Sequence, residues 1–221
     1  MSSLKNTLLA DSIRLSFGTF DVLNGAWLRS ETGKVTGVLG RNGCGKSCMF
    51  RTIMGGLKSQ GLYVRVNDEI VTGSMEMGKY IKYMAQKHFL PPKMTLSEVF
   101  EYFGADYEAF TDDFPKFAQY PQTKVKELSG GEIRIAEIWL CLCSDSPFCI
   151  LDEPFSYLAP VAIETIQRLI RKYKDQKGIV ISDHNYEALL EVSDEVLLLS
   201  DGYVHLIKDR SDLVRYGYCR M

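Results

Sequence analysis

The sequence predicts an α/β fold with a mainly parallel sheet, an N-terminal antiparallel β-subdomain and a short helical insertion. Its first forty residues contain short apolar runs separated by turn signals at Gly18 and Asp21, the pattern of β-structure. From Glu127 onward, apolar strands alternate with helices, as in a parallel sheet covered by helices. Between these parts, Pro91-Pro92 and a capping box that begins at Thr95 mark a separate helical stretch.

The N-terminal half shows strand patterns with one helix among them. A helix is expected to begin at Lys46, with apolar residues at helical spacing, and to end at the Gly55-Gly56 pair. Apolar runs bounded by turn residues predict strands over residues 8–17, 22–30, 34–39, 63–66 and 80–85. The strand over 34–39 runs directly into a glycine-rich turn, so the helix at Lys46 follows a strand and a turn.

The C-terminal half predicts the helices and the remaining core strands. Short helices are expected after Thr95 and over residues 107–110. Longer helices are expected near 131–143, over 160–173 and near 186–190, with strands over 148–151, 179–182 and 196–199. The helix over 160–173 carries one apolar stripe, and Pro160 stands in its first turn, where proline is tolerated.

Length and composition fit one globular domain. We expect a single domain over residues 1–221, with an α/β core at 1–86 and 147–221 and a helical subdomain at 87–146. Apolar residues at 46% and charged residues at 24% exclude disordered, collagen-like and coiled-coil chains. Twenty-six basic and 28 acidic residues give a net charge of −2, whereas binding nucleic acid needs a basic excess. No direct nucleic-acid partner is therefore expected.

Membrane and secretion signals are missing from the sequence pattern. No apolar stretch approaches the roughly 18 residues that would span a bilayer, and the N-terminus lacks a basic region followed by an apolar one. We therefore expect a cytoplasmic protein that reaches a membrane only through a partner.

A glycine-rich loop carries the first functional motif. Consecutive backbone N–H groups must wrap around a polyphosphate, and only glycine lets the chain approach so closely or take positive φ. Lys46 is expected to bridge the β- and γ-phosphates, and the Ser47 hydroxyl to ligand Mg²⁺. The loop predicts a P-loop NTPase core that binds nucleotide through Gly40, Arg41, Asn42, Gly43, Cys44, Gly45, Lys46, Ser47 and Cys48.

Cys44 and Cys48 flank Lys46 in this loop. The N-terminus of a helix and a nearby ammonium lower the pKa of a thiol, so we expect lowered pKa values and, as a hypothesis, inhibition by oxidation. Ordinary small apolar packing is the alternative.

A second motif ends an apolar strand with two carboxylates, Asp152 and Glu153. Beside a phosphate loop, Asp152 is expected to hold Mg²⁺ through water, and Glu153 to act as the general base on an attacking water. An Asp-Glu pair after a strand is common, and its meaning comes from following a phosphate loop by about a hundred residues.

The run Leu128-Ser129-Gly130-Gly131-Glu132 begins a helix and offers a second anion site at a helix N-terminus, as well as a capping box. With this run the chain resembles the ATP-binding cassette family, the ATPase subunits of ABC transporters, over nearly its whole length. The resemblance implies the ABC ATPase fold, ATP and Mg²⁺ as cofactors, and ATP hydrolysis. It also implies that Ser129, Gly130 and Gly131 meet the γ-phosphate held by the opposite cassette of a dimer.

The resemblance assigns roles to three further side chains. Phe17 is expected to stack on adenine, with Phe20 as a less favoured substitute and an ordinary core phenylalanine as the alternative. Gln86 is expected to reach Mg²⁺ and the attacking water. His184 is expected to contact the γ-phosphate, although a lone histidine is more often structural. The implied catalytic set is Glu153, His184, Gln86 and Lys46, and the implied metal ligands are Ser47, Gln86 and Asp152.

Three departures from the family pattern qualify these expectations. Ala159 stands where the family carries an aspartate that helps couple the two sites, and Leu140 where it carries an arginine. Only 42 residues separate Gln86 from Ser129, a short insertion at the place where the family receives its permease.

The function implied is an ATP-binding subunit that hydrolyses ATP at a dimer interface and powers transport by a separate membrane permease at the inner face of the cell membrane. The second cassette is either identical or different. Two alternatives stay open: an ABC ATPase without a transport role, and a slow regulatory cassette in a heterodimer. Ala159 and Leu140 favour the regulatory cassette, whereas Glu153 and His184 argue against it.

Overall fold

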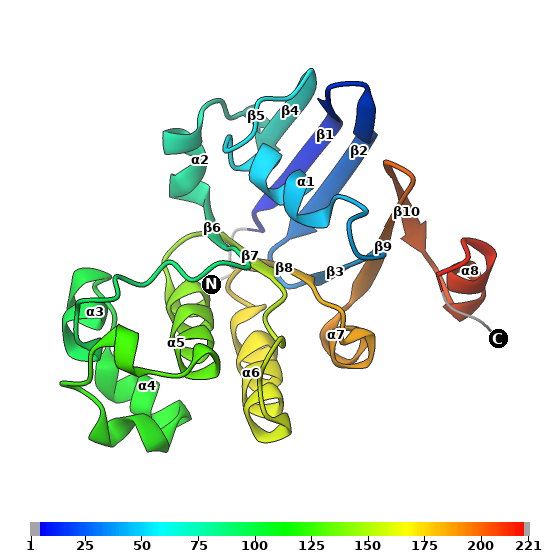
Figure 1. Ribbon diagram of the computed structural model, residues 1–221. Helices are drawn as coiled ribbons and strands as arrows, with labels where there is room; N and C mark the ends of the chain where they lie inside the picture. Colours follow the sequence, from blue (N-terminus) through cyan, green and yellow to red (C-terminus); the bar gives the residue numbers. More distant parts are fainter. Residues whose placement is uncertain (1–4, 219–221) are drawn as a thin grey trace.

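In the computed structural model, residues 5–218 are described, and they form two β-sheets with helices packed around them (Figure 1). Within these residues a four-stranded antiparallel sheet has the order β2-β1-β4-β5. Its strands are β1 (Thr7–Phe17), β2 (Phe20–Glu31), β4 (Gly61–Val66) and β5 (Glu69–Ile70).

The larger sheet has six strands within the described residues, in the order β10-β9-β3-β8-β7-β6. Neighbouring strands are parallel except for β9 and β10, which form an antiparallel hairpin. Strands β3, β7 and β8 are buried at every position, because helices cover the sheet. The strands are β3 (Val35–Leu39), β6 (Ile81–Met84), β7 (Phe148–Asp152), β8 (Gly178–Ser182), β9 (Glu195–Ser200) and β10 (Tyr203–Ile207).

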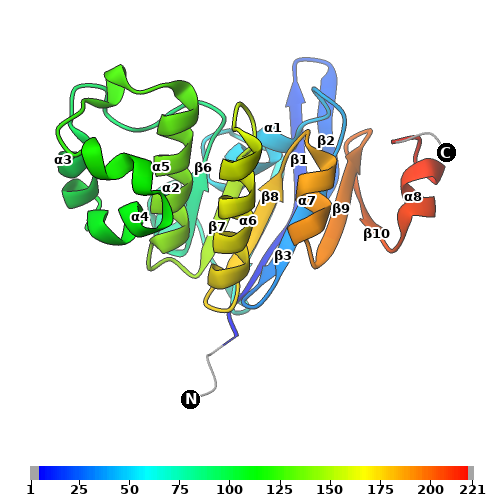
Figure 2. The same cartoon turned by 90° about the horizontal axis from the view of Figure 1, so that it is seen from below.

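Helices lie on both faces of the larger sheet. Helix α1 (Lys46–Ile53) lies between the two sheets, and α5 (Gly130–Cys143), α6 (Pro160–Tyr173) and α7 (Tyr186–Val192) cover the opposite face (Figures 1 and 2). Helices α3 (Leu96–Tyr102) and α4 (Tyr107–Asp113) gather with α5 at one end of the molecule. The remaining helices are α2 (Ser74–Tyr80), η1 (Pro115–Gln119), η2 (Val125–Glu127) and α8 (Arg210–Arg215).

The predicted α/β class, with an antiparallel N-terminal sheet and a mostly parallel core, is confirmed. The capping boxes at Thr95 and Ser129 form, and Pro160 is the first residue of α6. Tyr80 belongs to α2 and not to a strand, so the strand predicted over 80–85 begins one residue later. The sequence pattern did not predict β5, α2, β10 and α8, which carry neither a capping box nor a long apolar stripe. The subdomain boundaries at 87 and 146 stay a prediction.

The end that contains α3 and α4 has an aromatic core. Phe100, Phe110 and Trp139 contact one another, with ring centroids 4.7–5.6 Å apart. The indole N–H of Trp139 donates to Asp113 Oδ2 at 3.0 Å, which satisfies its polar atom. No helix within residues 5–218 is both long enough and apolar enough to cross a membrane.

Candidate nucleotide-binding site

The glycine-rich loop connects the buried end of β3 to α1. Gly43 and Gly45 take positive φ values of 77° and 111°, which a residue with a Cβ adopts only with strain. A Cβ on Gly40 would lie 2.4 Å from Cys44 Sγ and 2.8 Å from the Leu199 carbonyl oxygen. The backbone here therefore requires glycine for two reasons, conformation and close approach.

Lys46 lies inside the curve of this loop. Its side chain is almost fully buried, and its ammonium donates to the Gly40 carbonyl at 2.7 Å and to the Arg41 carbonyl at 3.4 Å. The positive charge is thus held where the backbone N–H groups of α1 also converge, so the loop has the electrostatics of an anion site.

A cavity of about 390 Å³ opens beside the loop. It brings together residues from the phosphate loop, from the segment after β6 and from the ends of β7 and β8, all of which the sequence analysis had selected. Its lining residues are Asn42, Gly43, Gly45, Lys46, Ser47, Cys48, Gln86, Glu153 and His184.

Asp152 ends β7 and is fully buried. Its carboxylate accepts a hydrogen bond from the Ser182 hydroxyl at 2.7 Å and another from the Tyr83 hydroxyl at 3.2 Å. Burial and the neighbouring carboxylate raise the pKa of Tyr83, so this phenol stays protonated and remains a donor. The two donors orient Asp152 without occupying all of its lone pairs.

Glu153 follows directly and has a positive φ of 57°. Its Oε1 accepts from the Gln86 amide at 2.7 Å and lies 2.6 Å from His184 Nε2. The three side chains come from three separate segments and meet on one carboxylate oxygen. Such a cluster at the mouth of a phosphate cavity has the geometry to orient a water molecule and accept its proton.

Ser129 caps α5, and its hydroxyl accepts the Glu132 backbone N–H at 3.3 Å. Ser129 and Gly130 are exposed, and Gly131, beside them in the first turn of the helix, is half-buried. Within this chain they lie outside the phosphate cavity. Ser129 and Gly131 instead line a separate apolar hollow of about 430 Å³ with Tyr157 and Ala159. This helix start therefore contributes no residue to the chain's own phosphate cavity.

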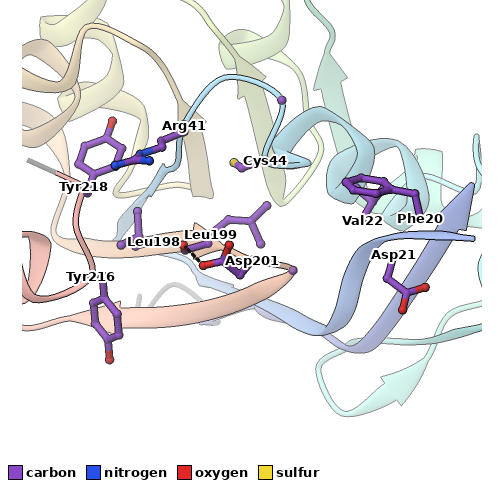
Figure 3. Close-up of a pocket in the computed structure, with 13 residues that line it drawn as sticks. Phe20, Asp21, Val22, Arg41, Cys44, Leu198, Leu199, Asp201, Tyr216 and Tyr218 are labelled. Atoms are coloured by element: carbon purple, nitrogen blue, oxygen red, sulfur yellow. Dashed lines mark hydrogen bonds between the residues drawn. The ribbon is translucent and has the colours of Figure 1, made fainter.

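Phe17 and Phe20 lie opposite each other at the turn between β1 and β2, and both are exposed, by 54% and 68%. Phe20, and not Phe17, lines a third cavity of about 470 Å³ on another side of the loop (Figure 3). The stacking role of Phe17 stays a prediction.

Arg41 points away from the phosphate cavity. Its guanidinium donates to the Gly217 carbonyl at 2.6 Å, and Figure 3 shows it beside Tyr218. Three residues of the predicted loop therefore do not line the phosphate cavity: Gly40, Arg41 and Cys44.

The expectation of a lowered thiol pKa at Cys44 is wrong. Burial raises the pKa of this thiol and outweighs the attraction of the Lys46 ammonium. The side chain is held against Gly40 at the back of the loop, so the helix N-terminus alone does not create a reactive thiolate there. The oxidation hypothesis loses its physical basis at Cys44.

Four residues near the site escaped the sequence analysis: Tyr83, Ser182, Arg134 and Glu137. Arg134 and Glu137 are charged residues at buried positions of a helix whose other buried residues are all apolar. A charge on the apolar face of a predicted helix was the available signal. Tyr83 and Ser182 had none, because strand ends commonly carry polar residues.

The buried parallel strands, the glycine loop and the carboxylate at the end of β7 together define a P-loop nucleotide-binding protein. The family model described as "ABC transporter" matches residues 23–156. The chain therefore belongs to the ABC transporter family, and it corresponds to the ATP-binding subunits of that family.

Named relatives cover most of the chain. A probable ABC transporter ATP-binding protein of Azorhizobium caulinodans is 27% identical over 231 residues, covering 96% of this chain and 81% of the relative. The lipopolysaccharide export system ATP-binding protein of Acidithiobacillus ferridurans is 28% identical over 218 residues, covering 91% and 89%. A solved ATP-binding subunit of an ABC transporter aligns with a TM-score of 0.81 at 20% identity, covering 95% and 93% of the two chains, which supports the fold.

Proposed function

We propose that this chain hydrolyses ATP to ADP and phosphate between two cassettes and thereby powers transport by a separate membrane permease. The observation that carries the proposal is the convergence of Gln86 and His184 on the Glu153 carboxylate, beside the Lys46 loop. A phosphate loop alone would support binding only. A carboxylate held by two polar side chains at the cavity supports chemistry on a bound phosphate.

The residues present fit both ATP and Mg²⁺. The loop glycines admit a polyphosphate against the backbone, and the Lys46 ammonium balances its charge. Ser47, Asp152 and Gln86 supply hydroxyl, carboxylate and amide oxygens, the hard donors that Mg²⁺ prefers. The ion would neutralise charge on the β- and γ-phosphate oxygens when bound.

In the proposed reaction, Glu153 accepts a proton from a water molecule whose oxygen attacks the γ-phosphorus. The bond from that phosphorus to the bridging oxygen breaks, and ADP leaves with the electron pair. Lys46 stabilises the charge on the phosphate oxygens, while Gln86 and His184 orient the water and the carboxylate.

The partners belong to the same proposal. Ser129 to Gly131 would contact the triphosphate held by a second cassette, because they are accessible and lie outside the chain's own phosphate cavity. A membrane permease would place the dimer at the inner face of the membrane. Relatives are named as ATP-binding proteins of lipopolysaccharide export and of aliphatic sulfonate import, which supports the kind of partner and not the cargo.

A slow regulatory cassette is the second candidate, favoured by Ala159. Ala159 is the N-cap of α6 and offers no side-chain hydrogen bond there. A chain of this kind would bind ATP and dimerise with a faster cassette, but would turn over slowly by itself.

The Glu153→Gln variant tests the leading proposal. Removing the proton acceptor should lower kcat by roughly 10²- to 10⁴-fold, while ATP binding remains and ATP holds two chains together. Steady-state phosphate release and size-exclusion chromatography with Mg-ATP measure the two effects. Glu164, an exposed glutamate on α6 outside the phosphate cavity, provides the matched control: the Glu164→Gln variant should behave as the unmodified chain. A Glu153→Gln chain that stays monomeric with saturating ATP would contradict the composite site.

A further inference from the structure

One helix holds the part of the chain that carries Gln86. We call residues 85–89, the first part of the connection from β6 to α3, the glutamine segment; Figure 1 shows this connection passing α5. Arg134 on α5 donates through Nη1 to the Ala85 carbonyl at 2.8 Å, and through Nη2 to the Gln86 carbonyl. The guanidinium thus fixes the backbone carbonyl groups immediately before and after the Gln86 Cα.

Glu137 fixes the other end of the glutamine segment. Its Oε1 accepts the Phe89 backbone N–H at 2.6 Å, and its Oε2 lies 2.9 Å from His88 Nδ1. Arg134 and Glu137 are three residues apart on α5, so they share a face of the helix, and their side chains lie 3.5 Å apart. His88 also lies beside the first turn of α5, with Nε2 3.7 Å from the place of a Cβ on Gly130.

Separating these two buried side chains from their hydrogen-bond partners would cost a large free energy. Arg134 is 4% exposed and Glu137 is fully buried, so each needs its hydrogen-bonded partners. Those partners are the backbone of the glutamine segment and the opposite charge. A shift of the segment relative to α5 would break the hydrogen bonds that these two buried side chains make with its backbone and leave their polar atoms unsatisfied. The segment and α5 therefore move as one body.

The same helix connects two functional places. Its N-terminus carries Ser129, which lies outside the chain's own phosphate cavity. Its second and third turns hold Gln86, whose amide donates to Glu153 at 2.7 Å. A displacement of Ser129 is thus carried through α5 to the hydrogen bond on Glu153.

We propose that Arg134 and Glu137 are positioning residues that make the place of Gln86 depend on what Ser129 contacts. This inference rests on the proposed function, in which Ser129 contacts nucleotide held by the second cassette. Occupation of one composite site then sets Gln86 against Glu153 in the other. The path runs through α5 and does not involve the loop at Ala159, so it supplies coupling where the carboxylate expected from the family resemblance is missing.

Arg134→Lys tests the kinetic side. Lysine keeps the charge but loses the planar fork that reaches two carbonyls. We expect kcat to fall about 10- to 100-fold, as for a displaced reacting group. The KM for ATP should change much less than kcat, because Lys46, Ser47 and Asp152 still hold the nucleotide and the ion when Gln86 is displaced. The Hill coefficient for ATP should fall toward one. Arg171→Lys, whose exposed guanidinium pairs with Glu191 at 2.8 Å, is the matched control and should change neither quantity.

Hydrogen exchange in the Glu153→Gln background gives a readout without hydrolysis. Adding Mg-ATP should protect the first turn of α5 and the glutamine segment together when Arg134 is intact, and only the first turn of α5 after Arg134→Lys. Unchanged kcat and joint protection after Arg134→Lys would overturn the inference, as would a parallel loss of ATP affinity. A chain that shows joint protection but releases no phosphate before Glu153 is changed would refute the proposed hydrolysis and leave this inference standing.

Discussion

Gly40 and Gly43 illustrate two different physical reasons for a glycine in the phosphate loop. Gly43 has φ of 77°, and a Cβ placed on it would meet open space, so its requirement is conformational. Gly40 faces Cys44 Sγ and the Leu199 carbonyl, so its requirement is space. Sequence spacing marks both glycines equally, and only the surroundings separate their roles.

Gly40→Ala should displace the loop, because the Leu199 carbonyl is backbone and has little freedom to move. We expect the free energy of unfolding to fall by about 1–3 kcal/mol, and ATP affinity to fall with it. Thermal denaturation and nucleotide titration measure the two effects. Gly78 lies inside α2 with open space around it, so the control variant Gly78→Ala should have the opposite effect and raise the free energy of unfolding by up to about 1 kcal/mol. Unaltered ATP affinity in the Gly40→Ala variant would show that the loop tolerates the contact.

At the scale of elements, α3 and α5 begin with the same chemistry. In both, a hydroxyl accepts the backbone N–H of the third helical residue, and a glutamate accepts the N-cap N–H. Thr95 caps a helix that the proposed site does not use, whereas Ser129 caps the helix proposed to contact a partner's nucleotide. Local capping and nucleotide contact are therefore separable by comparing the two helices.

Thr95→Ala and Ser129→Ala should each lower the free energy of unfolding by about 1 kcal/mol, the usual worth of an N-cap. Only Ser129→Ala should also weaken ATP-dependent dimerisation in the Glu153→Gln background. Chemical denaturation and size-exclusion chromatography separate the two effects. Equal dimerisation in both variants would assign Ser129 to capping alone.

At the scale of the whole molecule, the arrangement of sites favours an assembly. Ser129 and Gly131 share a hollow with Tyr157, which is 93% exposed, and Ala159, while the phosphate cavity lies elsewhere. A large exposed aromatic side chain beside an accessible helix start is typical of an interaction surface. Under the proposed function, a second chain would bring its own α5 helix start to the phosphate cavity of this chain.

The Ala159→Asp variant tests whether a carboxylate at this position stabilises the fold and increases cooperativity between the two proposed ATP sites. An aspartate at the N-cap of α6 should accept N–H groups that Ala159 leaves without a side-chain partner, raising the free energy of unfolding by about 1 kcal/mol. If the missing carboxylate limits coupling, the Hill coefficient for ATP should rise as well. Denaturation and steady-state kinetics provide both numbers. A gain in stability without a change in cooperativity would confine the role of this position to the helix end.

Local patterns predicted the long and regular parts of the fold. The helix over 160–173 was placed correctly because its apolar stripe spans nearly four turns, and the loop at 40–47 because its glycines lie close together in sequence. Helix α2 was missed because Gly73 before it offers no side-chain cap, whereas α3, also seven residues long, was predicted from the capping box at Thr95. The Cys44 prediction failed because burial is a tertiary property, and it outweighs the local effect of a helix N-terminus.

The sequence by itself determined the strand–loop–helix motif, the paired carboxylates and the helix-capping runs, since each depends on neighbours within a few residues. Only the tertiary structure decided that Gln86 meets Glu153, 67 positions away, and that Arg134 and Glu137 hold the glutamine segment 48 positions away. Contacts at such separation depend on how the strands are ordered and how α5 packs against the sheet, and no local pattern encodes that order.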